Sequence, residues 1–267
     1  MPTLDTVALE CLSVGQPDDK LERTARAHVA WLRGDIDCRH ADHAPRPAIA
    51  LAGRPTLPRL VPPRQLPRRK LGSVEGRAAL LHAVAHIEFN AINLAWDAVY
   101  RFRDMPRQYY ADWIGIAADE ARHFGLVSAR LAACGHAYGD FDAHDGLWDM
   151  ACKTADSCLA RMALVPRVLE ARGLDVTPGM IERLRSVGDE ASVQVLATIL
   201  EEEIPHVAAG SRWFEWCCDQ AGREPQATFR ELLAERMDAA LKPPFNRPAR
   251  LAAGFSTAEL DHLERLA

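Results

Sequence analysis

The stretch EEIPHVAAG, residues 202–210, places two glutamates, a proline and a histidine inside an otherwise apolar run. Glu203 and His206 form an ExxH motif, and residues three apart share one face of a helix. Both side chains can therefore reach one metal ion. Pro205 lacks the N–H of a regular helical hydrogen bond, so we expect a kink or a one-turn π-bulge between Glu203 and His206.

A second ExxH motif, Glu120 and His123, lies within WIGIAADEARHFGLV, residues 113–127. Apolar residues recur there at three- and four-residue intervals, which is typical of an amphipathic helix. Glu120 falls on or beside the core-facing stripe, where an unpaired charge would be costly. Two ExxH motifs in such positions indicate a metal site far more strongly than one.

Each ExxH helix follows a predicted helix whose apolar stripe contains a glutamate, Glu88 in the first case and Glu170 in the second. A four-helix di-metal site takes one glutamate from each of two helices and an ExxH motif from each of the other two. Glu88 is separated from Glu120 by nearly the same number of residues as Glu170 from Glu203. The sequence therefore predicts a helical hairpin that occurs twice.

The second hairpin requires a particular course of the backbone. Glu170 and Glu203 lie at one level only if the chain turns near Ser186–Asp189, about as far from each glutamate as Asp104–Pro106 lies from the first pair. The segment GLDVTP, residues 173–178, must then break the helix without reversing its direction. Its glycine and proline supply the means for such a break.

Long helical periodicities dominate the rest of the chain, and alternating strand patterns are almost absent. We predict an all-α fold with an N-terminal helix and an arm in 1–73, a four-helix bundle in 74–221 and a helical extension in 222–267. The individual helices are expected near residues 18–34, 74–103, 107–134, 146–173, 178–187, 189–220, 226–241 and 256–266.

The arm, residues 45–70, contains many prolines and basic residues and no acid, whereas the whole chain has a net charge of −5. Such a composition predicts an extended segment rather than a helix. One interpretation is that the basic arm packs on an acidic helical body. The alternative is a contact surface for a phosphate-bearing substrate or RNA.

Several segments between about residues 50 and 220 resemble a known family. The stretches RAALLHAVAHIEFNAINLAWDAVYRF, YYADWIGIAADEARHF, RMALVPRVLEARGLDVTPGM and HVAAGSRWFEW are similar to the bacterial DUF455 family. This resemblance implies a ferritin-like bundle and a di-iron centre but no particular reaction. The family pattern before the last histidine usually reads Asp-Glu, where this chain has Glu202-Glu203. The residues that resemble the ligands of the ferritin-like di-iron carboxylate superfamily are Glu88, Glu120, His123, Glu170, Glu203 and His206.

Roles within this set follow from the pattern. The glutamates of the ExxH motifs are expected to bridge two metal positions about 3.5–4 Å apart, with the other two glutamates as terminal ligands. Asp119 and Glu202 each precede an ExxH glutamate, and they either accept the second N–H of a ligating histidine or are solvated surface acids. His82 and His86 fall off the stripe of Glu88, so we interpret them as outer-sphere or surface groups.

Other potential ligands carry less weight. Cys38, His40 and His43 lie close together in the sequence, but without a rigid frame we interpret this cluster as coincidence. Seven cysteines without CxxC spacing favour free thiols in a reducing cytoplasm. The chain shows neither a signal peptide nor an apolar run of the roughly 20 residues that span a bilayer, so no membrane association is expected.

Carboxylate and imidazole ligands suit iron, or alternatively manganese. We expect a di-iron oxidoreductase, an oxygenase or oxidase that uses O₂, an electron donor and an unidentified organic substrate. A nucleoside in RNA is one candidate substrate, by analogy with ferritin-like tRNA hydroxylases. The alternatives are a ferroxidase or iron-binding protein and a non-catalytic, metal-stabilised binding module. The segments outside the bundle favour the oxygenase, because a cage-forming ferritin needs little beyond the bundle.

Overall fold

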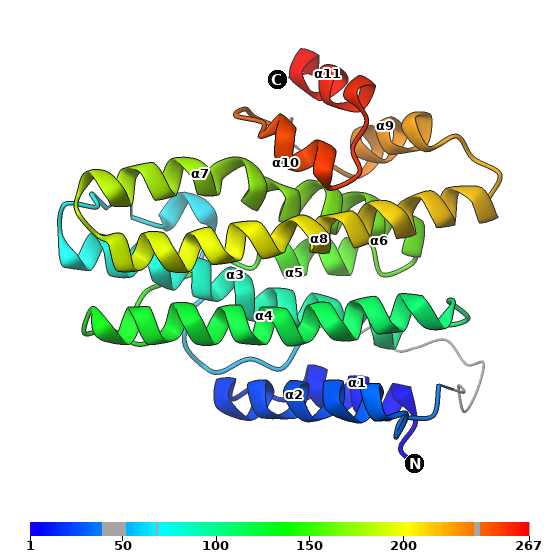
Figure 1. The fold of residues 1–267 in the computed structure, drawn as a ribbon, viewed down its shortest axis with the longest axis horizontal. Coiled ribbons are helices and arrows are strands. Elements are labelled where there is room, and N and C mark those ends of the chain that lie inside the picture. The colour runs from blue at the N-terminus through cyan, green and yellow to red at the C-terminus, as the bar shows by residue number, and fades with distance from the viewer. Residues whose placement is uncertain (39–51, 68, 238–240, 267) are drawn as a thin grey trace. The chain divides into compact units, whose positions relative to one another are not determined.

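The computed structural model describes residues 1–38, 52–67, 69–237 and 241–266 (Figure 1). Within these ranges the chain is helical and contains no named strand, so the predicted all-α class is confirmed. The chain divides into two compact units, Met1–Cys152 and Lys153–Ala267. This boundary lies between the two predicted hairpins, and each unit contains one of them.

Unit 1 is built on a hairpin of two long helices, α3 (Val74–Arg101) and α4 (Arg107–Ala133), which lie side by side (Figure 1). Both agree closely with the predicted helices. Ser73 caps α3 because its side chain accepts a hydrogen bond from the Gly76 amide at 3.0 Å. Asp104, in the turn between the helices, has a positive φ of 60°, which lets the chain reverse within a few residues.

Two shorter helices complete the core of unit 1, α1 (Leu4–Ser13) and α2 (Pro17–Arg33). The sequence predicted α2 but not α1. Helix α1 packs on α3, and α2 packs on α4. Lys20 is fully buried, and its Nζ donates to the carbonyl of Cys11 at 2.9 Å and to Asn93 Oδ1 at 2.6 Å. This lysine thus satisfies a carbonyl at the end of α1 and joins that helix to α3.

The described part of the arm, residues 52–67 and 69–70, belongs to unit 1 and is extended apart from one 3₁₀ turn, η1 (Pro63–Gln65). Arg59 donates to both carboxylate oxygens of Asp142, at 3.0 and 2.6 Å. This ion pair joins the arm to the loop that follows α4. Other predicted features lie outside the described residues, namely His40, His43, residues 45–51 and Arg68.

Unit 2 also contains a helical hairpin. The first half of this hairpin is a continuous series of helical segments, and the second half is one long helix. The chain reverses at Val187–Asp189, which confirms the predicted turn. Asp189 Oδ1 caps the long helix of the second half by accepting a hydrogen bond from the Ser192 amide at 3.1 Å. The segments are α6 (Cys158–Leu164), the π-helical η2 (Val165–Glu170), α7 (Ala171–Ser186) and α8 (Glu190–Gln220).

The predicted helix break at 173–178 is wrong, because α7 runs through this segment without interruption. Pro178 removes the N–H that would bond to the carbonyl of Leu174. Asn246 Nδ2 donates to that carbonyl at 3.0 Å instead. A side chain distant in the sequence therefore replaces the missing hydrogen bond and allows the helix to continue.

Two further expectations are corrected. Helix α8 remains α-helical through Pro205, so the predicted π-bulge is absent there. The π-helical turn lies instead in η2, which packs against α8 and contains Pro166. The predicted helix 146–173 is also not continuous, because α5 (Gly146–Lys153) ends before α6 begins.

The C-terminal part of unit 2 consists of α9 (Pro225–Arg236), α10 (Arg247–Ala252) and α11 (Thr257–Leu266). The sequence predicted α9 and α11, although α9 ends earlier than expected, and it missed α10. Arg250 of α10 forms a buried bidentate pair with Asp175 of α7, at 2.9 and 2.7 Å. In the described part of the chain, no helix combines the length and apolarity needed to cross a membrane.

Candidate metal centre

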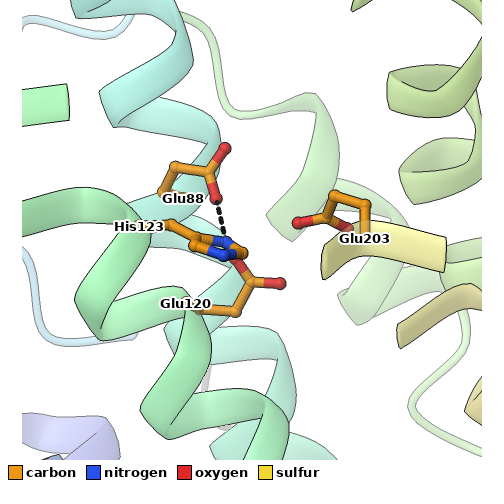
Figure 2. A group of neighbouring side chains, drawn as sticks. All are labelled: Glu88, Glu120, His123 and Glu203. Carbon is orange, nitrogen blue, oxygen red and sulfur yellow. Dashed lines mark ion pairs between the residues drawn. The ribbon is translucent and has the colours of Figure 1, made fainter. Parts of the chain in front are cut away.

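The first candidate cluster consists of Glu88 on α3 with Glu120 and His123 on α4. His123 Nδ1 lies 3.4 Å from Glu88 Oε2 and 3.5 Å from Glu120 Oε2 (Figure 2). Glu88 is 4% exposed, Glu120 is 1% exposed and His123 is 0% exposed. Helices α3 and α4 thus bring two carboxylates and an imidazole together within unit 1.

The hairpin explains why these residues meet. Glu88 and Glu120 lie at similar sequence distances from the turn at Phe102–Pro106, so the antiparallel packing of α3 and α4 brings them to one level. His123 is three residues after Glu120 and shares its helix face. Each of the three side chains offers one ligand atom, and these atoms lie within 4.8 Å of one another.

The donor set of the first cluster fits a metal ion. Carboxylate oxygens and an imidazole nitrogen are the ligands that iron and manganese accept in proteins. Two buried carboxylates are costly without a counter-charge. A divalent cation held by Glu88, Glu120 and His123 would supply that charge and would use all three side chains.

The second candidate cluster consists of Glu203 and His206 on α8, with His206 Nδ1 3.6 Å from Glu203 Oε1. Their side chains are 13% and 3% exposed, and Glu203 is also drawn in Figure 2. Glu170 is the last residue of η2, which packs on α8. Glu170 and Glu203 lie at similar sequence distances from Gly188, which has the positive φ of the hairpin turn. Unit 2 thus repeats the sequence pattern of a glutamate followed by an ExxH motif, and the meeting of Glu170 with Glu203 and His206 stays a prediction.

The two candidate outer-sphere acids are less buried than the clusters. The side chain of Asp119 is 50% exposed, and its Oδ1 lies 3.8 Å from Arg122 Nη2. Glu202 is partly exposed. Their assignment as acceptors for histidine N–H groups stays a prediction, as does the sharing of two metal ions by the two clusters.

His82 and His86 are not surface groups, because they are only 1% and 7% exposed. The loop between α4 and α5 covers them. His86 Nδ1 forms a hydrogen bond of 2.8 Å with the hydroxyl of Tyr138, and the Gly139 amide donates to His82 Nε2 at 2.9 Å. The sequence carried no signal of this burial, because the helical stripe shows only which residues share a face with Glu88.

Burial lowers the pKa of His82 to about 4, and the nearby charge of Asp140 only partly opposes this effect. The unfolded chain therefore binds a proton near pH 6.5 that the folded chain binds near pH 4, and stability decreases as the pH falls through this window. We expect His82→Gln, which keeps an acceptor for Gly139 but cannot titrate, to reduce the loss in unfolding free energy between pH 7 and pH 5 by about 1–2 kcal/mol.

Urea unfolding at the two pH values measures this effect. His28 of α2 is partly exposed and provides the matched control. The same measurements on His28→Gln show how much of the change comes from replacing a histidine by glutamine on a helix. An unchanged pH dependence in His82→Gln would contradict the role given to this buried imidazole.

These observations define an all-helical protein whose two hairpins carry the same carboxylate and histidine pattern. The chain belongs to the family described as "Protein of unknown function (DUF455)", whose model matches residues 13–261. The resemblance to the DUF455 family seen in the sequence is thereby confirmed. The chain is also 44% identical over 222 residues to an "Uncharacterized protein" of Haemophilus influenzae (strain ATCC 51907 / DSM 11121 / KW20 / Rd), an alignment that covers 80% of this chain and 77% of that protein. No solved structure is significantly similar to the chain.

Proposed function

We propose that the chain is a ferritin-like di-iron oxygenase or oxidase that acts on an organic substrate with O₂. The observation that supports this proposal is the repetition of one ligand pattern, because each hairpin carries a glutamate on one arm and an ExxH motif on the other. Four-helix di-metal sites use this combination. The burial of the first cluster and of His206 supports it further.

Within the proposed site, Glu120 and Glu203 would bridge two iron ions, while Glu88 and Glu170 would be terminal ligands. Each ExxH histidine would add one nitrogen ligand from the same helix face as its glutamate. Iron bound there would supply the redox chemistry for the reduction of O₂. The burial of Glu88 and Glu120 excludes bulk water from these ligands and strengthens their electrostatic interaction with a cation.

An organic substrate is favoured over iron itself because much of the chain lies outside the two hairpins. Helices α1 and α2, the arm and α9–α11 add structure that binding and oxidation of iron alone do not require. A nucleoside substrate rests on analogy only, and the pairing of Arg59 with Asp142 engages part of the basic arm within unit 1. The seven cysteines, all within the described residues, form no disulfide bond, which supports the expected reducing compartment.

Anaerobic loading with Fe²⁺, followed by metal analysis and exposure to O₂, tests the proposal. We expect two iron ions per chain and a change in absorbance when O₂ is admitted. Repeated O₂ consumption with iron as the only reductant would favour a ferroxidase, and bound iron without any redox change would favour a metal-stabilised module. A chain that binds neither iron nor manganese would contradict the proposal altogether.

A further inference from the structure

The π-helical segment η2 ends at Glu170, one of the proposed ligands. The wider π turns are rare, occur mostly as single turns within α-helices and are frequent at functional sites. Pro166 lies in this turn against Gly210 of α8, and a Cβ atom on Gly210 would be 2.3 Å from Pro166 Cβ. The absent side chain of Gly210 therefore lets η2 approach α8 closely.

Arg167 anchors the same π turn from another side. Its side chain is 3% exposed, and its Nη2 donates to Glu259 Oε1 of α11 at 2.6 Å. The guanidinium carbon lies 4.7, 4.5 and 4.6 Å from the ring centroids of Phe214, Phe229 and Phe255. A cation enclosed by three aromatic rings and one carboxylate has little freedom to move.

The partner of Arg167 is itself held in place. Glu259 Oε2 accepts a hydrogen bond from the Ser256 amide at 2.8 Å, and the Glu259 amide donates to Ser256 Oγ at 3.2 Å. This reciprocal arrangement is a capping box at the start of α11. Because both Glu259 oxygens are engaged, a movement of Arg167 would require the start of α11 to rearrange.

A second contact holds the chain on the other side of Glu170. Asp175 of α7 pairs with the buried Arg250 of α10, and its Oδ1 also accepts from the Asn246 amide at 2.9 Å. The C-terminal part of unit 2 therefore contacts this helical segment on both sides of Glu170 in the sequence, through Arg167 and through Asp175. These contacts restrict the rotation and translation of the turn that carries the ligand.

We infer that Arg167 and Glu259 are positioning residues for Glu170, through which the C-terminal helices set the geometry of the metal site. This inference rests on the proposed di-metal function. Neither residue is a proposed ligand. Their effect on metal binding comes from the π turn whose position they fix, as the supports of a ligand affect its metal.

Titration with Co²⁺, whose visible absorption reports coordination, tests the inference in the variant Glu259→Gln. We expect the wild type to bind two ions, and the variant to bind one of them at least about tenfold more weakly with an altered spectrum. The control Asp156→Asn removes the same charge from unit 2. Asp156 pairs with Arg236 at 2.8 Å, and the Asp156 side chain is 64% exposed. It should titrate like the wild type.

A Glu259→Gln variant that is folded, as judged by circular dichroism, and that titrates like the wild type would overturn the inference. Failure of the wild type to bind Co²⁺ would instead overturn the proposed function. If Glu259→Gln does not fold, the double variant Arg167→Met/Glu259→Leu removes both charges and leaves no buried charge without its partner. Weak binding of one ion by the folded double variant supports positioning, whereas wild-type binding shows that the pair serves the fold alone.

Discussion

Replacing Glu120 with alanine should abolish the binding of two iron ions per chain and leave the protein helical. Glu120 is 1% exposed and lies 3.5 Å from His123, so its carboxylate is central to the first cluster. Its removal takes away a proposed bridging ligand. It also removes one anion from a cluster of carboxylates, which relieves repulsion in the metal-free protein. Metal analysis after anaerobic loading and far-UV circular dichroism measure the two outcomes.

Asp112→Ala is the matched control for this experiment. Asp112 lies on the same helix, is partly exposed and accepts a hydrogen bond from Gln108 at 2.8 Å. This variant should retain both metal ions. If Glu120→Ala also retained them, Glu120 would not be a ligand. A complete loss of helical signal in Glu120→Ala would show that the cluster serves the fold.

Replacing Arg250 with methionine should lower the free energy of unfolding by about 3–5 kcal/mol, because it breaks a buried ion pair and leaves one charge behind. The side chains of Arg250 and Asp175 are 1% and 0% exposed. The carboxylate of Asp175 would then lose both guanidinium hydrogen bonds without access to water. Urea unfolding, followed by circular dichroism, measures the change.

Arg236→Met provides the comparison. Arg236 pairs with Asp156 at a similar distance, but the side chain of Asp156 is largely exposed. Exposed pairs contribute at most about 1 kcal/mol, so this substitution should have a much smaller effect. Equal effects of the two substitutions would show that burial does not decide the contribution of the Arg250 pair.

The sequence alone determined the main helices and the ligand pattern. Helices α3, α4 and α8 are long and periodic, so their ends lie close to the predicted ones. The grouping of Glu120 with His123 follows from the three-residue spacing on a helix, which is a local property. Glu88 lies at the same level of the hairpin as Glu120 because both are similarly far in sequence from the turn that Pro106 marks. Local geometry and hairpin symmetry were sufficient for these features.

The course of the first half of the hairpin in unit 2 was not predictable in this way. Pro178 read as a helix break, but Asn246 replaces its missing hydrogen bond. A kink or a π turn was expected at Pro205, whereas the π turn lies around Pro166, where Gly210 of the neighbouring helix leaves room for the ring. Proline changes the hydrogen bonds that are available, but a distant segment decides whether the helix then breaks, bulges or continues.

The burial of His82 and His86 shows the same distinction on the other face of α3. The sequence by itself determined that Glu88 lies on an apolar stripe and that these histidines lie off it. Only the tertiary structure decided that Tyr138 and its loop cover the opposite face and accommodate both imidazoles. The physical reason is that helical periodicity specifies which residues share a face, whereas the packing of distant segments specifies which faces are removed from water.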